Sequence, residues 1–347
     1  MAFLDDPGLA ASLVLFAVCT VVILLAGTQL TGIVDELADR TGLGEALAGA
    51  VLLGMATSLS GIVLSVTAAY RGQPELAMSN ALGGIAAQTL FLTIADLRLK
   101  GVNLEHAAAS IGNMMQGTLL ICLLALILVG AFSPNITFWG VHPITLVLLA
   151  SYGYGLTIVR SGQANAMWFP TRTRETREDV PDEGSMQRSL VRLWLSFAAL
   201  AVAMGVSGWL LQGAATVISA ETGLGQAVIG VLLTSVVTSL PELVTTVAAV
   251  RRGALTLAVS GIIGGNAFDT LFAAASDVAY REGSIYHAVS HEVLLWVALS
   301  ALMTGVLLLG LIRREKHGPG RIGFESVALI VLYFSGVAMV FLAPYGA

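Results

Sequence analysis

The chain has 347 residues, of which 56% are hydrophobic and only 11% are charged, and its net charge is -5. Its mean hydropathy is +0.85. A soluble domain has about 25% charged residues, so this composition indicates a polytopic membrane protein and excludes a soluble enzyme or a nucleic-acid-binding protein. The two cysteines, Cys19 and Cys122, lie in apolar runs and suggest neither a disulfide framework nor a metal cluster. The acidic N-terminal residues precede a run long enough to span, so no cleavable signal peptide is expected.

Ten runs are apolar and long enough to cross a bilayer, which takes about 20 residues per helix. In chain order they cover residues 9–32, 43–69, 76–97, 106–131, 138–159, 189–212, 224–249, 254–279, 288–312 and 323–345. The polar stretch 160–188 is too charged to cross. The predicted fold is therefore all-α, with ten transmembrane helices. Residues 1–159 form an N-terminal five-helix repeat, 160–188 a linker loop, and 189–347 a C-terminal five-helix repeat.

The lysines and arginines fall unequally on the two sides of the membrane. With this span assignment, 15 of the 17 lie on one side, and Arg71 and Arg281 lie on the other. Positive residues concentrate on the cytoplasmic side of membrane proteins. We therefore expect a cytoplasmic loop at 160–188 and both termini outside, in a plasma (inner) membrane.

An internal repeat relates residues 41–96 to residues 222–277 at a constant offset of 181. About two dozen of the 56 positions are identical, in blocks such as TGLG, TSL, GG and TLF. Five predicted spans separate the copies, so the second copy crosses the membrane in the opposite direction. Inverted repeats of this kind are typical of secondary transporters, whose substrate site lies near the bilayer midplane between the repeats.

The segment TSLPEL, residues 238–243, places a proline and a glutamate in the middle of an apolar span. Pro241 lacks an N–H and crowds the carbonyl four residues earlier, so it predicts a structural kink. On a continuous helix, four oxygen-bearing side chains would form one stripe: Thr234, Thr238, Glu242 and Thr245. Oxygen ligands suit hard cations such as calcium and sodium. An ionisable group at mid-membrane is by default a functional candidate.

The next span contributes a second polar group in the segment IIGGNAFDTLF. Asn266 and Asp269 lie three residues apart, on one helix face. Glu242 and Asp269 together would balance the charge of a divalent ion. Each feature also has a structural explanation when taken singly, because proline kinks helices, glycine pairs allow helix packing and a buried glutamate can be protonated.

These two segments resemble the two-part repeat motif of the sodium/calcium exchangers, within the calcium/cation antiporter superfamily. The resemblance implies that Glu242 is the main metal-binding carboxylate and that Asp269 occupies the second acidic position of the metal site. It further implies a cation-binding set that also includes Thr238, Ser239, Asn266, Thr57, Ser58 and Gln88. No cofactor is implied apart from the transported cations, which are calcium or sodium, or protons. Membrane lipid is the other expected partner.

The first copy of the motif departs from the family pattern. It has Ser60 in place of the proline and Gly61 in place of a second glutamate, whereas Thr57 and Ser58 match. This copy is therefore expected to have lost both the carboxylate and the helix kink. The loss of one carboxylate removes a ligand and a charge, and ligand charge tunes calcium affinity. The sequence alone therefore leaves open whether the transported ion is calcium, another divalent metal or a monovalent cation.

The function that we expect is secondary active antiport of calcium, or another cation, in exchange for sodium or protons by alternating access. Three alternatives stay open at this point. They are a channel, a non-transporting relic of a transporter, and a membrane-embedded enzyme, which is disfavoured because no cluster of acids and histidines suited to a lipid headgroup is found. Outside the motif, the repeat-matched pairs Asp96/Asp277 and His106/His287 lie near span ends, where helix-end contacts or an interfacial position explain them best.

Overall fold

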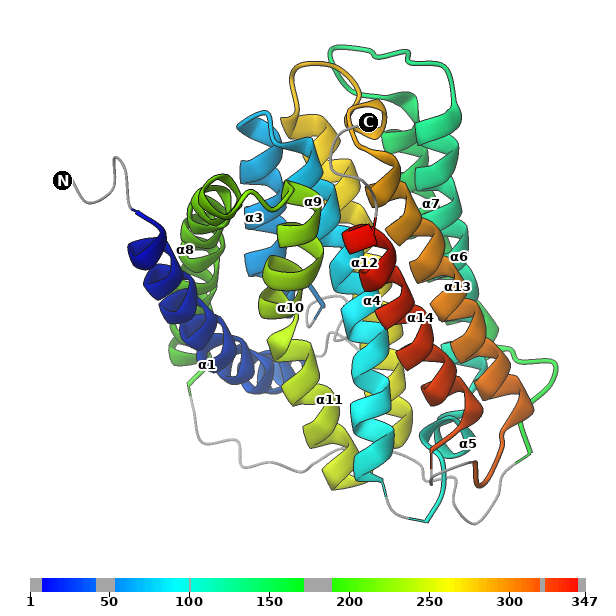
Figure 1. Cartoon of the computed structure of the whole chain (residues 1–347). Coiled ribbons are helices and arrows are strands. Elements are labelled where there is room, and N and C mark those ends of the chain that lie inside the picture. The colour runs from blue at the N-terminus through cyan, green and yellow to red at the C-terminus, as the bar shows by residue number, and fades with distance from the viewer. Residues whose placement is uncertain (1–7, 42–53, 100, 172–188, 319–321, 343–347) are drawn as a thin grey trace.

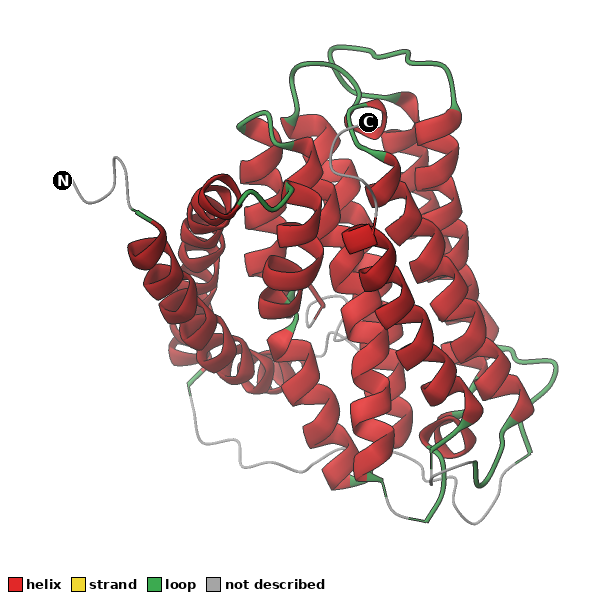
Figure 2. Ribbon diagram, in the orientation of Figure 1, coloured by secondary structure: helices red, strands yellow, loops and turns green. Residues whose placement is uncertain are grey.

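The computed structural model describes residues 8–41, 54–99, 101–171, 189–318 and 322–342. Within these ranges the protein is built of helices and connecting loops, and one isolated β-bridge joins Phe138 to Val141 (Figures 1 and 2). The first half contains α1 (Leu9–Thr41), α3 (Leu59–Tyr70), α4 (Pro74–Arg98), α5 (Leu104–Ala108), α6 (Ile111–Phe132) and α7 (Pro143–Ala164). The second half contains α8 (Leu190–Thr222), α9 (Gln226–Ile229), η2 (Gly230–Thr234), α10 (Ser235–Thr238), α11 (Leu240–Arg252), α12 (Leu255–Ala279), η3 (Ile285–His287), α13 (His291–Arg313) and α14 (Phe324–Leu342).

Eight of these helices are long and apolar enough to cross a membrane, and the bent pair 226–238 and 240–252 makes a ninth candidate span. The chain is therefore an integral, multi-pass membrane protein. The remaining expected span, 43–69, is described only from Gly54 onwards, and its helix α3 has 12 residues. Residues 42–53, which include most of the TGLG block, lie outside the described part of the chain, as do residues 172–188 of the expected loop.

The fourth expected span, 106–131, begins later than the sequence suggested. The structure separates a short helix, α5, from α6, which begins at Ile111. The Ser110 hydroxyl accepts a hydrogen bond from the Asn113 backbone N–H at 3.1 Å. A serine in this position satisfies one of the free N–H groups at a helix start, so the boundary falls at Ser110 although hydropathy continues across it.

Helices α4 and α12 form the buried centre of the molecule, and α1 lies apart from them. Figure 1 shows α1 and α8 side by side at an angle to the main bundle, with α8 also packed on α3. Two glycines allow this pair to approach the interrupted helices closely. A Cβ on Gly27 of α1 would overlap the ring of Pro241, and one on Gly208 of α8 would overlap the carbonyl of Ser60. The two contacts are equivalent in the repeats, because Gly208 lies 181 positions after Gly27 and Pro241 lies 181 positions after Ser60.

The segment around Pro241 is interrupted. The helix breaks at Ser239, where φ is -97° and ψ is 2°, and the two parts meet at 45°. Pro241 then lies in the first turn of α11, where its missing N–H leaves no helical hydrogen bond unmade. The continuous stripe expected from Thr234 to Thr245 is therefore wrong, because this break and the π-helical turn at 230–234 change the faces on which these residues lie.

The first repeat keeps the same break without a proline. Ser58 has φ -82° and ψ 3°, almost the values of Ser239, and α3 begins directly after it. The interpretation that the first copy had lost its helix break along with its proline is therefore wrong. The break is therefore present in both copies, and in the first copy it forms without a proline.

Two buried aspartates tie helix ends together in the same way in each half. Asp96 accepts hydrogen bonds from the Leu104 N–H (2.8 Å), the Gly323 N–H (3.2 Å) and the Ser326 hydroxyl (3.0 Å). Asp277 accepts from the N–H groups of Ile285 (3.0 Å) and His142 (2.8 Å) and from the Thr145 hydroxyl (2.6 Å). Each residue of the first set lies 181 positions from its counterpart in the second. The repeat relation therefore extends well beyond the matched sequence blocks.

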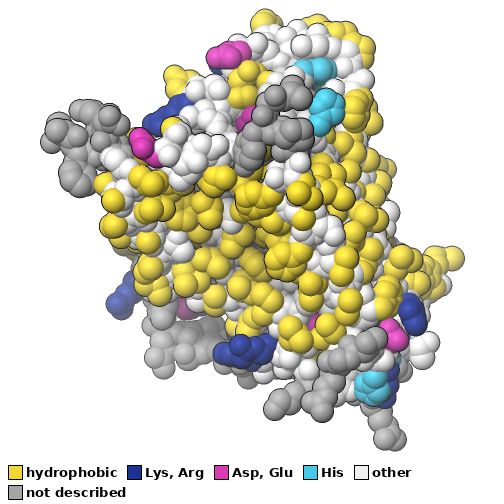
Figure 3. Space-filling model, in the orientation of Figure 1, with side chains coloured by type: hydrophobic (Ala, Val, Ile, Leu, Met, Phe, Trp, Pro, Cys, Tyr) yellow, Lys and Arg dark blue, Asp and Glu magenta, His cyan; other side chains and the backbone are white. Residues whose placement is uncertain are grey.

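The surface agrees with a membrane protein. Hydrophobic side chains cover the middle of the face shown in Figure 3, and lysine and arginine side chains gather mainly at its lower end. This end, where α4, α11 and α13 finish with Arg98, Arg252 and Arg313, is called the arginine-rich end below.

Candidate functional site

The two acidic residues singled out in the sequence lie together in the interior. Glu242 is in the first turn of α11 and Asp269 is in the middle of α12, and both are at most 5% exposed. Burying a charge is costly unless it is paired or bound to a metal. The arrangement therefore requires that protons or cations occupy the site.

Ser58, at the helix break of the first repeat, bridges the two carboxylates. Its hydroxyl lies 2.6 Å from Asp269 Oδ1 and 3.4 Å from Glu242 Oε1. A single hydroxyl proton can serve one of these oxygens at a time, and the shorter distance assigns it to Asp269. The helix break places the Ser58 hydroxyl beside both acids, so the first repeat contributes a hydroxyl to this cluster, and both acids come from the second repeat.

Gln88 of α4 supplies the second contact to Asp269. Its Nε2 donates to Asp269 Oδ2 at 2.7 Å and to the Ser239 hydroxyl at 3.1 Å. Ser58 with Asp269 and Ser239 with Gln88 are therefore the same pairing in the two repeats. Each repeat therefore supplies the serine at its helix break and one polar residue of its central helix, Gln88 on α4 or Asp269 on α12, and each serine contacts the polar residue of the other repeat.

Three buried oxygens around this centre accept no hydrogen bond. They are Glu242 Oε2, Gln88 Oε1 and Asn266 Oδ1. Buried polar atoms are nearly always satisfied, and oxygens that lack a donor are suited to a cation. Among the described residues, no three His, Cys, Asp or Glu side chains gather as a metal cluster, so two carboxylates and several neutral oxygens form the candidate ligand set.

The other predicted ligands are buried nearby but make different contacts. The Thr57 hydroxyl lies 3.3 Å from the Gly54 carbonyl and also interacts with Glu242. Thr238 contacts the Ser235 carbonyl at 3.2 Å and lies at the limit of hydrogen bonding, 3.5 Å, from Asn80 Oδ1. The structure therefore does not bring Thr238 into direct hydrogen-bond contact with the acids.

Asn266 is the predicted ligand that points elsewhere. Its Nδ2 donates to the Thr89 hydroxyl at 2.9 Å, one residue beyond Gln88 on α4. This contact joins the two central helices, α4 and α12. The side-chain oxygen of Asn266, Oδ1, is one of the unpartnered atoms described above. A role as a direct ligand stays a prediction.

The space beside Gly61 is filled by an aromatic ring. A Cβ on Gly61 would lie 2.8 Å from Phe272 Cε2 and 3.6 Å from Thr238 Cβ. Phe272 belongs to α12, one helical turn after Asp269. The position that resembles a glutamate position of the exchangers therefore faces the site region, and a larger residue there would have to displace Phe272.

Sequence reasoning missed Asn80, which is 1% exposed on α4. Its Nδ2 donates to the Ser65 hydroxyl at 3.0 Å and to the Gly61 carbonyl at 3.3 Å. Asn80 lies eight residues before Gln88, which is about two helical turns and places both amides on nearly the same face. That spacing, in a helix already chosen for Gln88, was the signal available in the sequence.

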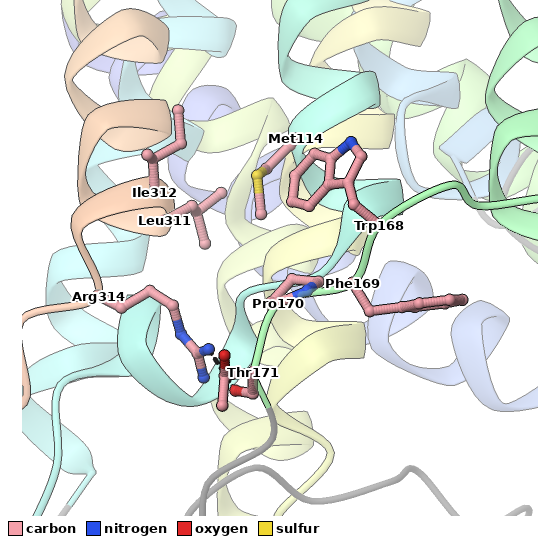
Figure 4. Close-up of a pocket in the computed structure, with 8 residues that line it drawn as sticks. All are labelled: Met114, Trp168, Phe169, Pro170, Thr171, Leu311, Ile312 and Arg314. Atoms are coloured by element: carbon pink, nitrogen blue, oxygen red, sulfur yellow. Dashed lines mark hydrogen bonds between the residues drawn. The ribbon is translucent and has the colours of Figure 1, made fainter.

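A surface pocket of about 310 Å³ lies elsewhere, at the arginine-rich end. Its lining residues are Met114, Trp168, Phe169, Pro170, Thr171, Leu311, Ile312 and Arg314 (Figure 4). The Arg314 guanidinium donates to the Thr171 carbonyl and to the His106 carbonyl. Neither Glu242 nor Asp269 lines this pocket, so it is separate from the candidate site.

Comparisons with known proteins agree with this architecture. The family model described as "Sodium/calcium exchanger protein" matches residues 11–159 and 192–342. Among curated relatives, the inner membrane protein YrbG of Escherichia coli (strain K12) is 25% identical over 244 residues, which cover 70% of this chain and 72% of YrbG.

Solved structures share the fold at low sequence identity. The sodium-calcium exchanger NCX_Mj, soaked with Na⁺ and Sr²⁺, superposes with a TM-score of 0.58 at 18% identity, over 95% of this chain and 98% of that one. The H⁺/Ca²⁺ exchanger CAX gives a TM-score of 0.63 at 12% identity, over 98% of this chain and 87% of that one. Both likenesses concern the fold.

Proposed function

Because the chain belongs to the sodium/calcium exchanger protein family, and is thus a transporter and not an enzyme, we propose that it exchanges calcium for sodium or protons at the site formed by Glu242 and Asp269. The observation that supports this most directly is the pair of buried carboxylates, in which Glu242 Oε2 lacks a donor, beside the unpartnered amide oxygen of Gln88. Calcium takes about 6–8 oxygen ligands, and a mixture of carboxylate, hydroxyl and amide oxygens can supply them.

The proposal includes ten spans arranged as two inverted repeats of five, with 1–159 and 189–347 as the repeats and 160–188 as the loop between them. The matched hydrogen bonds of Asp96 and Asp277 at offset 181 support it. The positive-inside pattern supports a cytoplasmic position for the arginine-rich end, with both termini outside. An inner membrane protein among the relatives supports the same membrane for this chain.

The proposal includes alternating access by movement of α1 and α8, and the packing of these two helices supports it. These two helices contact each other extensively and reach the interrupted segments through Gly27 and Gly208. The helix breaks at Ser58 and Ser239 lie under this pair, so a shift of the pair relative to the bundle would open the site to one side or the other. Exchange results when two cation species compete for the same two carboxylates.

The decisive experiment is radiolabelled calcium uptake into proteoliposomes that contain the purified full-length chain. The uptake would be driven in turn by an outward sodium gradient and by an outward proton gradient. We expect uptake under one gradient, which identifies the counter-ion, and loss of that uptake in Glu242→Gln. The matched control is Glu221→Gln, because Glu221 is an exposed acid at the end of α8.

Uptake in Glu242→Gln equal to that of the unchanged protein would refute the site. Absence of calcium uptake under both gradients, in a protein that is folded and inserted, would refute calcium as the substrate. Sodium and potassium flux under the same conditions would then test a monovalent exchanger. Flux that needs no counter-ion would instead identify a channel.

A further inference from the structure

The two repeats build the same framework at the two ends of the bundle, but one pair of positions differs in chemistry. The His106 ring hydrogen-bonds the Arg314 carbonyl, and the His287 ring hydrogen-bonds the Ser133 carbonyl, each at 2.7 Å. The two histidines are equivalent at the offset of 181, and so are Ser133 and Arg314. Within this matched framework, Glu105 and Glu325 occupy the positions of Tyr286 and Ile144. The fold therefore forms at one end without any acid at these positions.

Glu105 and Glu325 form a buried carboxyl pair at the arginine-rich end. They are 0% and 1% exposed, and their carboxyl groups interact directly. No donor from another described residue reaches any of their four oxygens. Two negative charges in this position would repel each other and lack solvation, so the pair requires at least one bound proton.

The surroundings leave little room for a different partner. A Cβ on Gly310 would lie 2.8 Å from Glu325 Cγ, and one on Gly323 would overlap Glu325 Oε1. Glycine at these two positions lets α13 and the start of α14 close around the carboxyl group. A proton fits in such a space, whereas a hydrated cation does not.

The charged groups that face the pair come from three elements. Helix α4 provides Asp96, whose charge acts on Glu105, while its Arg98 is exposed to solvent. Helix α13 ends in Arg313, which pairs with Glu315 at 3.5 Å, and Arg314, which donates to backbone carbonyls.

Lys316 also lies close to α5, because its carbonyl accepts a hydrogen bond at 3.1 Å from the N–H of Asn103, the residue before α5. His106 follows Glu105 on α5, and its ring bonds the Arg314 carbonyl. Helix α12 packs on α5 and has no titratable residue between Leu255 and Phe268. Asp96 is therefore the charged side chain with an identified effect on the pair, and its sign opposes ionisation.

We propose that Glu105 and Glu325 form a second protonation site, separate from the cation site, through which the pH at the arginine-rich end controls transport. The bound proton joins α5 to the first turn of α14. Loss of the proton creates two charges that push these elements apart. The link to transport and the cytoplasmic location of this end rest on the function proposed above.

Asp96 connects this site to the transport machinery. It accepts hydrogen bonds from the starts of both α5 and α14, and it lies on α4, eight residues after Gln88. Separation of α5 from α14 therefore pulls on the helix that holds the Gln88 ligand. The Tyr286 end lacks this carboxyl pair, because Tyr286 and Ile144 stand in place of the two glutamates and the Tyr286 hydroxyl is hydrogen-bonded to Thr145.

The direction of the pH effect follows from the pKa of Glu105. Burial, followed by the charges of Asp96 and Glu325, raises this pKa well above its usual value of 4.5. The native state then binds more protons than the unfolded state between 4.5 and the raised pKa. Stability that is complete below the unfolded pKa of 4.5 is therefore lost as the pH rises through this window.

The first test measures the melting temperature of the purified full-length protein from pH 5 to pH 9. It compares the unchanged protein with Glu105→Gln, Glu325→Gln, the double variant, and the pair Glu105→Tyr with Glu325→Ile that copies the other end. One released proton lowers the melting temperature of a chain of this length by about 2 °C per pH unit at most. We expect the double variant and the copied pair to lose this component of the slope, and Glu221→Gln, at an exposed acid at the end of α8, to keep it.

Infrared difference spectra provide a second measurement that needs neither transport nor a melting transition. We expect a protonated-carboxyl band at neutral pH that the double variant lacks and that titrates in the unchanged protein. Absence of any difference between the two spectra, or equal melting slopes in all the variants, would overturn the proton site.

The effect on transport is measured separately, in vesicles of known orientation at varied pH on the arginine-rich side. Transport whose dependence on that pH is the same in the double variant as in the unchanged protein would overturn the regulatory role. Failure of all transport would instead refute the proposed antiport, and the melting and infrared results would still decide on the proton site.

Discussion

Gln88 and Asp269 occupy equivalent positions in the two repeats and hydrogen-bond directly to each other, with 2.7 Å between Gln88 Nε2 and Asp269 Oδ2. Equivalent residues can meet in this way only near the axis that relates the repeats. The contact therefore marks the centre of the molecule. It also shows how the two halves have diverged, because one half provides the charge and the other provides the donor that stabilises it.

The contact between Gln88 and Asp269 leads us to predict that the carboxylate and the amide can exchange positions between the repeats. Gln88→Asp places a third carboxylate in the site, and Asp269→Gln removes one of two. Each single change should weaken calcium transport about tenfold or more, because a hydrogen bond to a charged group contributes about 1.5–3 kcal/mol. The double variant restores one acid and one amide and should recover much of the apparent affinity in uptake assays. A double variant no better than the weaker single variant would contradict this reciprocity.

Helix α8 offers a matched pair of glycines for a test of close packing. A Cβ at Gly208 would overlap the Ser60 carbonyl, whereas one at Gly213 meets no atom within 4 Å. Gly208→Val should therefore destabilise the protein by about 1–3 kcal/mol, as overpacking does, and should abolish uptake. Gly213→Val should change neither property. Equal melting temperatures and uptake rates for the two variants would show that α8 does not contact the first repeat in this way.

Restoration of a glutamate at position 61 should require space as well as charge. Gly61→Glu alone collides with the Phe272 ring, so we expect a lower melting temperature and no gain in calcium affinity. Gly61→Glu combined with Phe272→Ala provides room for the side chain and should bind divalent cations more tightly than Phe272→Ala alone. Calcium titration of the purified variants measures this difference. Tighter binding in the single variant would show that Phe272 moves away without cost.

The two framework aspartates should prove equally important. Asp96→Asn and Asp277→Asn each place an amide donor opposite backbone N–H groups, which leaves buried groups unsatisfied at a cost of about 1–3 kcal/mol for each group. Because the three partners correspond at both ends, we expect similar decreases in melting temperature. Glu221→Gln, at an exposed acid, is the control. A decrease confined to one variant would mean that the two ends are not held in the same way.

Much of this architecture could be predicted from the sequence because its signals are local. Apolar runs of about 20 residues identified the long helices, and the repeat register of 181 residues identified which positions are equivalent. The same register, applied beyond the matched blocks, leads to Ser133 with Arg314 and to Thr145 with Ser326. The residues in each of these pairs differ in type, so a comparison of the sequences alone does not reveal them. Their equivalence is recognised from the contacts that they make with the histidines and aspartates.

The errors arose where backbone geometry overrides side-chain pattern. The stripe from Thr234 to Thr245 assumed a continuous helix, and Pro241 was taken as the cause of the break. Ser58 adopts nearly the same backbone conformation in a segment without a proline, so a proline is not needed for such a break. Single-sequence patterns do not include the approach of α8 to Ser60 and therefore could not predict it.

The concentration of both site carboxylates in the second repeat has an electrical consequence. When ionised, Glu242 and Asp269 together would hold two negative charges, and the described residues of the first repeat that contact them, such as Ser58 and Gln88, are neutral. One divalent ion, two monovalent ions or two protons neutralise such a site equally well. An exchange cycle limited to these occupancies moves no net charge across the bilayer, so its direction is set by the two concentration gradients and is independent of the membrane voltage.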